Sequence, residues 1–349
     1  MSIYNAQLPN VLKTDAGDLV TTPQEWARRR EEIKNLLMTQ FLGTYPDQVS
    51  MTHKVIEEGE ALGGKANCQK IQIHLGSDTH ETDFSFQLIF SQRKRPASII
   101  LHLDFTEQYP AITEELIDEG FGLAHVNYND IEKDISEERF DGMQGLCPER
   151  NGSRWGKIGC WAFGTNRIVD VLKDHLHVEH IILAGHSRLA MTALWAGAMD
   201  ERIDVIAAIN SGGLYRGTQA ETFHDLSREY TKYWFCHDLF LNYQAEEELP
   251  FDMHFVLALI APRLIFLDGA TRDQWCDPYA LYACGKAVSP VYEALGLPGL
   301  AGPDRPAPES AYLTGQIGYY LREGTHYFGR DDWRQLIRFV REHIQSEDR

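Results

Sequence analysis

The sequence predicts an α/β protein whose central sheet is mostly parallel and doubly wound, with helices on both faces. Two observations lead to this fold class. Short apolar runs typical of buried strands alternate with longer stretches typical of helices from about residue 97 to residue 344. Alternation of this kind implies strand–helix–strand crossovers, which set consecutive strands parallel to one another. We expect the 349 residues to form one elaborated domain over 1–349.

The elements follow in chain order. We expect residues 1–60 to be an N-terminal helical extension, because Thr22 is a suitable N-cap ahead of Pro23 and a helix over 23–42. Residues 70–75 and 84–91 alternate enough to pair as an antiparallel entry hairpin. Strands are then predicted at 97–103, 121–128, 180–184, 204–210, 263–268 and 316–321, and helices at 112–119, 158–175, 188–199, 278–295 and 332–344.

Two segments stand outside this alternation. Residues 214–250 are rich in aromatic side chains and are predicted to be a lid-like insertion, whose rings either wall a pocket or pack on the core. Asp252 is expected to cap the helix that runs to Ala261, which leaves His254 as a packed structural histidine. Residues 296–308, rich in glycine and proline, are predicted to be a surface loop.

Composition excludes several classes of function. The formal charge of −18 disfavours nucleic acids and anionic membranes as partners, and no apolar stretch is long enough to span a bilayer. The N-terminus lacks the pattern of a signal peptide, which favours a cytoplasmic protein with its six cysteines as free thiols. The sequence shows neither a phosphate-binding glycine loop nor ligands at metal spacing, so we expect no cofactor and no metal. The oligomeric state cannot be derived from these features.

The strongest chemical signal is the segment Gly185-His186-Ser187-Arg188, between a predicted strand and an alanine-rich predicted helix. A serine at such a sharp turn is the nucleophile elbow of serine hydrolases, which exposes Oγ above the sheet. Gly185 gives the turn room, although Leu189 occupies the place of the usual second glycine. The alternative is that Ser187 only caps the helix.

The remaining triad members are predicted from position, because chemistry in such folds lies at the carboxyl ends of the strands. His326 follows the last predicted strand, and the required order of nucleophile, acid and histidine leaves Asp273 or Asp277 as the acid. Asp277 is well placed to cap the next helix, so Asp273 is preferred, with Asp268 third. By the same rule Phe105, just past the strand at 97–103, lines the site or packs in its loop.

These motifs resemble carbohydrate esterase family 15, the glucuronoyl esterases, which have the α/β-hydrolase fold. The resemblance covers nearly the whole chain and is carried by Thr22-Pro23-Gln24-Glu25-Trp26, Gly43-Thr44-Tyr45-Pro46, Gly156-Lys157-Ile158-Gly159-Cys160-Trp161, the elbow, Asn210-Ser211-Gly212-Gly213, Leu249-Pro250-Phe251-Asp252-Met253-His254, Trp275, His326 and Asp332-Trp333. It implies that Arg188 contributes to the oxyanion hole and that Trp275 stacks on a sugar. The alternative for Arg188 is a surface salt bridge.

Departures from the family pattern concern the substrate. Met191 stands where glucuronoyl esterases carry a lysine that binds sugar hydroxyls, and Asn210 stands where fungal members place their acid. Phe223 and Thr231 fall near the family's polar sugar-binding positions. A site that recognises hydroxyl groups depends on its hydrogen-bonding side chains, so their loss weakens the expectation of a sugar substrate.

The sequence therefore predicts a serine hydrolase that cleaves a small-molecule ester, carbohydrate-derived or not, through Ser187, His326 and Asp273. Two alternatives remain open. One is different chemistry on the same scaffold, such as lactone, dienelactone or amide hydrolysis or a lyase step. The other is a binding protein that keeps the fold without catalysis, although the complete set of Ser, His and Asp argues against it.

Overall fold

A mixed sheet runs through the whole molecule in the computed structural model, which describes residues 8–137, 140–147, 155–218, 223–228 and 231–344. Within these residues ten strands pair in the order β1-β2-β3-β5-β4-β6-β7-β8-β10-β9. The strands are β1 (Ser50–Ala61), β2 (Ala66–Gly76), β3 (Glu81–Ser91), β4 (Ser98–Asp104), β5 (Gly122–Asn127), β6 (His180–His186), β7 (Val205–Ile209), β8 (Leu264–Ala270), β9 (Ser310–Tyr312) and β10 (Ile317–Arg322).

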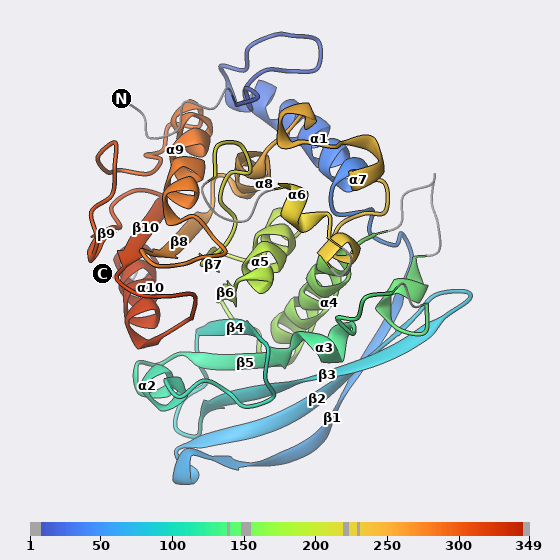
Figure 1. Cartoon of the computed structure of the whole chain (residues 1–349). Coiled ribbons are helices and arrows are strands. Elements are labelled where there is room, and N and C mark those ends of the chain that lie inside the picture. Colours follow the sequence, from blue (N-terminus) through green and yellow to red (C-terminus); the bar gives the residue numbers. More distant parts are fainter. Residues whose placement is uncertain (1–7, 138–139, 148–154, 219–222, 229–230, 345–349) are drawn as a thin grey trace.

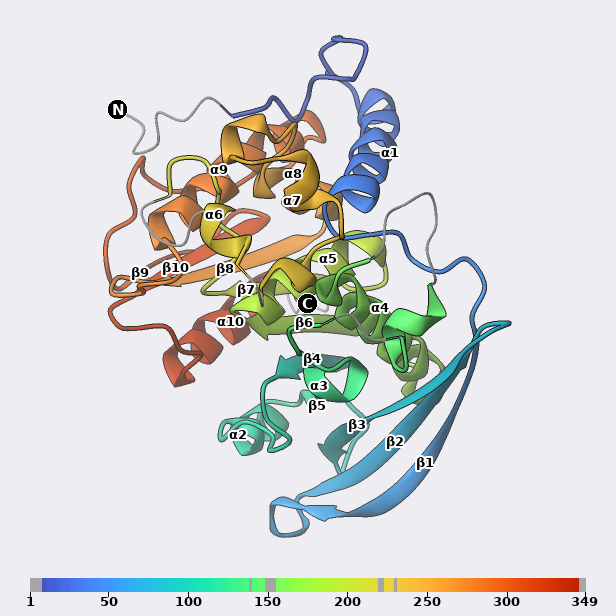
Figure 2. The ribbon, with the colours of Figure 1, turned by 45° about the vertical axis from the view of Figure 1, so that its right-hand side comes forward.

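The middle of the sheet is parallel, as predicted. The strands β5, β4, β6, β7, β8 and β10 pair in parallel, so their carboxyl ends meet at one edge. The strands β1, β2 and β3 pair antiparallel and form a long twisted ribbon at one side (Figure 2), and β9 pairs antiparallel with β10 at the other. The predicted entry hairpin is therefore β2 with β3.

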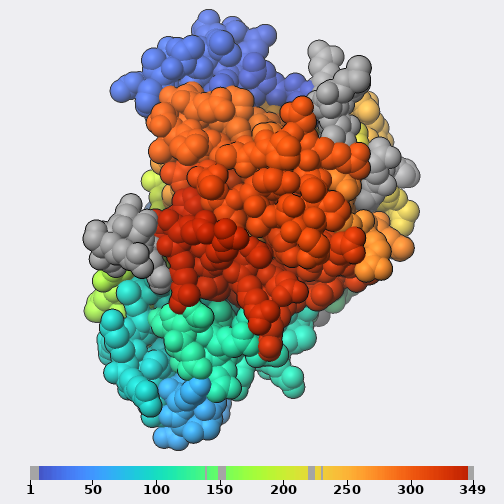
Figure 3. All heavy atoms as spheres, turned by 90° about the vertical axis from the view of Figure 1, so that its left-hand side faces the viewer, coloured from blue at the N-terminus to red at the C-terminus, as the bar shows by residue number. Residues whose placement is uncertain are grey.

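Helices cover both faces of the sheet (Figure 1). One core packs against α1, α4, α5, α8 and α9, and the second packs against α2 and α10. The space-filling view in Figure 3 shows the C-terminal residues between the N-terminal segment and the first strands. The helices are α1 (Pro23–Gln40), α2 (Thr113–Asp118), α3 (Tyr128–Ile131), α4 (Lys157–Val171), α5 (Arg188–Met199), α6 (Phe223–Leu226), α7 (Leu239–Asn242), α8 (Met253–Ile260), α9 (Pro278–Ala294) and α10 (Arg330–His343).

Strand side chains alternate between the two cores. In β6, Ile181 and Leu183 pack toward α4 and α5, whereas Ile182 and Ala184 pack toward α10. The next residue of the second set, His186, therefore belongs to the α10 face of the sheet. The same alternation assigns His102 of β4 and His125 of β5 to that face, because Ile100 and Leu123 lie in the α10 core.

The N-terminal prediction was only partly right. Thr22 caps α1, with its Oγ accepting from Glu25 N at 3.3 Å while the Glu25 carboxylate accepts from Thr22 N at 3.0 Å. Residues 50–61, however, form β1 and not part of a helical extension. The strand's outer positions are charged and exposed because it lies at the sheet edge, so its sequence lacks an apolar run.

The predicted lid at 214–250 forms short helices in its described part, with Trp234 and Phe235 buried. Residues 219–222 and 229–230 of that segment lie outside the described residues, and of Phe223 only the backbone is described. A role as a moving lid stays a prediction. In the described part of the chain, no helix is both long and apolar enough to cross a membrane. The six cysteines, all within the described residues, are thiols that form no disulfide with one another.

Candidate active site

Ser187 lies on a strained turn between β6 and α5. Its backbone has φ 58° and ψ −131°, a conformation that is costly for a residue with a Cβ atom. A Cβ at Gly185 would stand 2.1 Å from the Leu189 carbonyl oxygen, so only glycine fits there. Within the described residues the Ser187 side chain makes no capping hydrogen bond to α5. The alternative of a simple helix cap is therefore wrong, and the nucleophile elbow is confirmed as local geometry.

The acid and the base are in contact. His326 Nδ1 lies 2.7 Å from Asp273 Oδ2, and the Asp273 side chain is fully shielded from solvent. The other carboxylate oxygen accepts from the backbone N–H groups of Trp275 at 2.9 Å and Cys276 at 3.0 Å. Because a carboxylate can only accept, Nδ1 of His326 carries the proton and Nε2 is left as a base.

The two other candidate carboxylates have different partners. Asp277 Oδ1 accepts from the backbone N–H groups of Tyr279 and Ala280 at 2.9 and 3.1 Å and so caps α9. Asp268 is buried next to Asp332, and its pKa is raised well above the ordinary value by burial and then by the Asp332 charge. The predicted alternative acid Asp277 is thus wrong, and Asp273 is the residue that orients His326.

The backbone around His326 is held by Arg322, a residue that the sequence analysis missed. Arg322 Nη2 donates to the carbonyl oxygens of Thr325 at 3.0 Å and Tyr327 at 2.9 Å, one on each side of His326. Its Nε donates to Asp332 Oδ1 at 2.7 Å, and both side chains are buried. A paired, buried guanidinium therefore fixes the histidine loop. Its position at the carboxyl end of β10 was the available signal.

His186, the residue before the nucleophile, packs against the ring of His326. Its ring centroid lies 4.5 Å from that of His326, and the next residue along the chain is Ser187. Burial, followed by the neighbouring His326, lowers the pKa of His186 to about 3, so this ring is neutral at physiological pH. A neutral neighbour places no competing positive charge beside the imidazolium that His326 forms during catalysis.

Arg188 is held by a second acid that the sequence analysis missed. Arg188 Nη1 is ion-paired with Asp134 Oδ2, and the guanidinium carbon lies 4.4 Å from the ring centre of Trp234. Trp234 Nε1 donates to the other Asp134 oxygen at 3.0 Å. Asp134 lies in the loop after α3, the short helix that follows β5 at the carboxyl edge of the sheet, where a functional side chain is expected. The ion pair is largely buried, so the alternative of a surface salt bridge is wrong, whereas the oxyanion role of Arg188 stays a prediction.

The residues predicted to contact the substrate lie near the carboxyl edge of the sheet, as the triad does. Trp275 is 60% exposed, and its ring centroid lies 5.2 Å from that of His326. Met191 is buried and lines a pocket with Trp275. Phe105 packs edge-on against His186 and under Arg188, and is not among the lining residues. The lining of this pocket combines apolar residues such as Leu214, Met253 and Leu281 with the polar residues Asn210, Ser211, Thr218 and Asp277.

The chain order of these residues, serine then aspartate then histidine, together with the strained turn at the carboxyl edge of a parallel sheet, defines a serine hydrolase of the α/β-hydrolase class. A family model described as glucuronyl esterase, fungi, matches residues 73–296. The chain therefore belongs to the glucuronyl esterase family and is a carboxylic ester hydrolase.

Relatives of known name cover nearly the whole chain. A carbohydrate esterase from an unknown prokaryotic organism is 29% identical over 97% of this chain and 89% of its own length. Among solved structures, a promiscuous esterase of carbohydrate esterase family 15 from a marine bacterial metagenome is 26% identical, with a TM-score of 0.87 over 97% of this chain and 98% of that one. The glucuronoyl esterase of Solibacter usitatus is 28% identical, with a TM-score of 0.86 over 96% and 97%.

Proposed function

We propose that the protein hydrolyses esters of a uronic or similar sugar-derived carboxylic acid through an acyl-enzyme on Ser187. The observation that carries the proposal is the 2.7 Å contact between Asp273 and His326, whose ring packs on that of His186, the residue before Ser187 on its strained elbow. The names of the relatives support the substrate class, since they include glucuronoyl esterases and 4-O-methyl-glucuronoyl methylesterases.

In this proposal each group has a role. Ser187 Oγ attacks the ester carbonyl carbon while its proton passes to His326 Nε2, and Asp273 stays ionised and stabilises the imidazolium. The carbonyl oxygen becomes an oxyanion, which the backbone N–H after Ser187 and the Arg188 guanidinium stabilise. The leaving alcohol takes the proton from His326. Water then attacks the acyl-enzyme by the same steps and releases the acid and free Ser187.

The expectation of weaker recognition of sugar hydroxyl groups rests on Met191 alone, since polar residues such as Asn210 and Ser211 also line the pocket. Trp275 offers a flat, exposed ring beside His326 on which a sugar ring can stack. Met191, however, contributes a thioether where sugar-binding relatives carry a lysine, and a thioether is only a weak hydrogen-bond acceptor. The enzyme is therefore expected to accept esters that differ in their ring hydroxyls.

The test compares the methyl ester of glucuronic acid with 4-nitrophenyl acetate. We expect the wild-type protein to hydrolyse both, and S187A to hydrolyse neither while its circular-dichroism spectrum is unchanged. Hydrolysis of aryl acetate alone would overturn the uronic-acid proposal but leave the esterase. Turnover of lactones or amides in place of both esters would replace it with another reaction on the same triad.

The variant M191K sharpens the substrate proposal. A lysine at this position adds hydrogen-bond donors to the pocket, so KM for the glucuronate ester should fall while KM for aryl acetate stays constant. M191L, which keeps the volume without adding a donor, serves as the matched control. Equal effects of both variants on both esters would show that Met191 does not face the sugar.

A further inference from the structure

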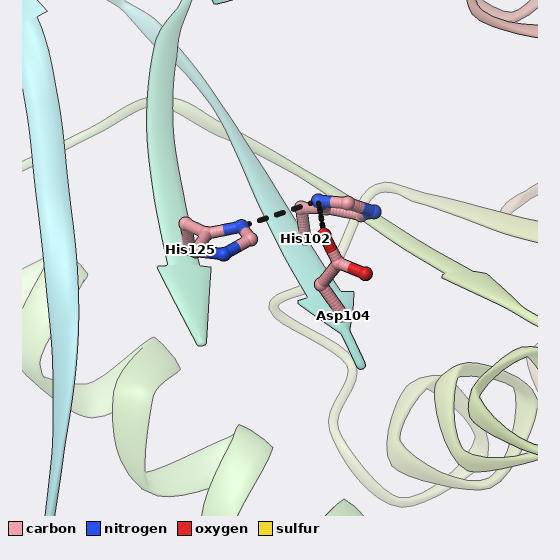
Figure 4. Close-up of side chains that lie close together, drawn as sticks. All are labelled: His102, Asp104 and His125. Carbon is pink, nitrogen blue, oxygen red and sulfur yellow. Dashed lines mark hydrogen bonds and ion pairs between the residues drawn. The ribbon is translucent and has the colours of Figure 1, made fainter. Parts of the chain in front are cut away.

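Two buried histidines that are not part of the triad face each other on the α10 side of the sheet. His102 of β4 and His125 of β5 are direct neighbours in the parallel register, and Asp104 follows at the end of β4 (Figure 4). His102 Nδ1 lies 3.3 Å from His125 Nδ1 and 4.0 Å from Asp104 Oδ2. Each residue thus offers one donor atom, and the three atoms lie within 4.8 Å of one another.

The hydrogen bonds around His125 fix its tautomer. His125 Nε2 lies 3.1 Å from the Thr106 carbonyl oxygen, which can only accept, so the proton of the neutral ring is on Nε2. The lone pair on Nδ1 of His125 is consequently free to accept and points at His102 Nδ1. A ring nitrogen turned inward by a backbone acceptor on its other nitrogen is the usual arrangement of histidines that bind metal ions.

The separation of the two nitrogens matches a specific ion. Two nitrogens at about 2.05 Å from a tetrahedral zinc ion stand about 3.3 Å apart. The carboxylate of Asp104 is held through Oδ1, which accepts from Phe105 N at 2.6 Å, while Oδ2 accepts a long hydrogen bond from Thr106 Oγ1 at 3.4 Å and lies 4.0 Å from His102 Nδ1. To become the third ligand, Oδ2 must give up the long hydrogen bond from Thr106 and turn toward the two nitrogens, and water would complete a tetrahedron.

We propose that His102 Nδ1, His125 Nδ1 and Asp104 Oδ2 bind one divalent transition-metal ion of the zinc type. Two imidazoles and one carboxylate form a donor set that suits zinc better than calcium or magnesium, which prefer oxygen ligands. In the metal-free protein His102 donates its Nδ1 proton to His125. When the ion binds between the two nitrogens, that proton moves to Nε2 of His102, so both rings stay neutral.

The site would act on the loop that reaches the active site. Asp104 would bind the ion, and the Thr106 carbonyl group orients His125. Between these two residues lies Phe105, whose ring packs against His186 and Arg188. An ion at the base of this segment would restrain it. The expected role is therefore structural, and the ion takes no part in the proton transfers of the triad.

A second group of donor atoms must be separated from this one. Asp273, Cys276 and His326 also offer donor atoms within 4.8 Å of one another, but Asp273 and His326 belong to the triad and are already engaged in the 2.7 Å contact. The two groups differ in one atom type, because only the triad group contains a sulfur. Cobalt(II) distinguishes them, since a thiolate ligand adds a strong near-ultraviolet charge-transfer band that nitrogen and oxygen ligands lack.

The experiment titrates the metal-free full-length protein with Co²⁺ and follows its visible spectrum, then repeats the titration with Zn²⁺ against a chromophoric chelator. We expect one equivalent of Co²⁺, intense visible bands of four-coordinate cobalt and no thiolate band, with displacement by Zn²⁺. H125Q keeps a donor to Thr106 but removes the Nδ1 ligand, and H102F keeps an aromatic ring. Each should weaken Zn²⁺ binding about tenfold or more, and each should lose the rise in melting temperature that Zn²⁺ gives the wild type.

Three matched measurements make the outcome decisive. C276S should bind as the wild type does, and H74Q, which removes an exposed histidine beside Asp83, should also bind normally. Melting in the presence of a chelator shows whether each variant is folded. The proposal is overturned if the wild type binds no Zn²⁺, if H102F and H125Q both bind as tightly as the wild type, or if C276S or H74Q abolishes binding.

Discussion

The carboxyl edge of the sheet carries two histidine clusters that differ in what faces the imidazole. In the first, His326 has a buried carboxylate at 2.7 Å on one nitrogen, and its ring lies beside the exposed Trp275. In the second, His102 faces another imidazole at 3.3 Å, with the carboxylate at 4.0 Å. The first arrangement makes a base, because the carboxylate stabilises a charged ring, whereas the second makes a pair of neutral ligands.

The largest expected effect is a loss of kcat that affects the first cluster and leaves metal binding at the second unchanged. D273N keeps the shape of the acid but removes the charge that stabilises the His326 imidazolium, so kcat should fall about 10⁴-fold. Zinc affinity at His102 and His125 should not change. Steady-state kinetics and the chelator titration measure the two readouts. A fall of less than tenfold in kcat would show that Asp273 is not the triad acid.

A smaller loss of kcat is expected when Arg322, which holds the backbone around His326, is replaced. R322K keeps a charge near Asp332 but cannot bond to both Thr325 and Tyr327 in the geometry of a guanidinium. The His326 loop should then be less well positioned, and kcat should fall about 10²-fold with KM nearly constant. R334K, an exposed arginine on α10, is the control. Equal kinetics for R322K and the wild type would contradict a positioning role.

His186, which lies between the two histidine clusters, should make the free energy of unfolding depend on pH. The pKa of His186 is lowered from 6.5 to about 3 in the folded protein, so the unfolded chain binds a proton that the folded chain does not. Stability should therefore fall as the pH drops from about 6.5 toward 3, with up to about 1.4 kcal/mol per pH unit from this group. H186Q should flatten the slope of the unfolding free energy against pH in urea melts. If H74Q, which replaces an exposed histidine, flattened this slope equally, the pH dependence would not arise from the buried His186.

The smallest expected effect is the loss of stability on replacing Asp277, the carboxylate that caps α9 and does not contact His326. D277A removes the N-cap of α9, so it should lower the unfolding free energy by about 1 kcal/mol. Its kcat should stay far above that of D273N, because the carboxylate that contacts His326 is intact. Thermal unfolding and kinetics on the same preparation check both statements. If D277A lost activity as severely as D273N, the assignment of the acid would be reversed.

The sequence predicted the parts of this enzyme that rest on local patterns. The alternation of apolar runs gave the parallel strands, and the elbow around Ser187 and the positions of Asp273 and His326 follow from strand ends. Asp134 was missed because its role depends on a contact with Arg188, which lies 54 positions further along the chain. Arg322 was missed although its partners are close in sequence, because spacing alone does not show that its guanidinium turns back onto the carbonyl groups beside His326. The strand β1 was missed because an exposed edge strand is mostly polar.

The same limit applies to the second histidine cluster. His102 and His125 are separated by 23 positions, and only the parallel register of β4 and β5 brings them together. The expectation of no metal, drawn from ligand spacing along the chain, could not account for such a pair. The predicted cytoplasmic location also stays a prediction, which fractionation of the native cells would test.

The most direct test of the account is covalent labelling of the nucleophile. The protein is incubated with a fluorophosphonate and digested, and the modified peptide is identified by mass spectrometry. The account predicts one adduct per chain, at Ser187, with activity lost in proportion to labelling and slow labelling in H326A. An active, folded enzyme that remains unlabelled, or that carries its adduct at another serine, would contradict it.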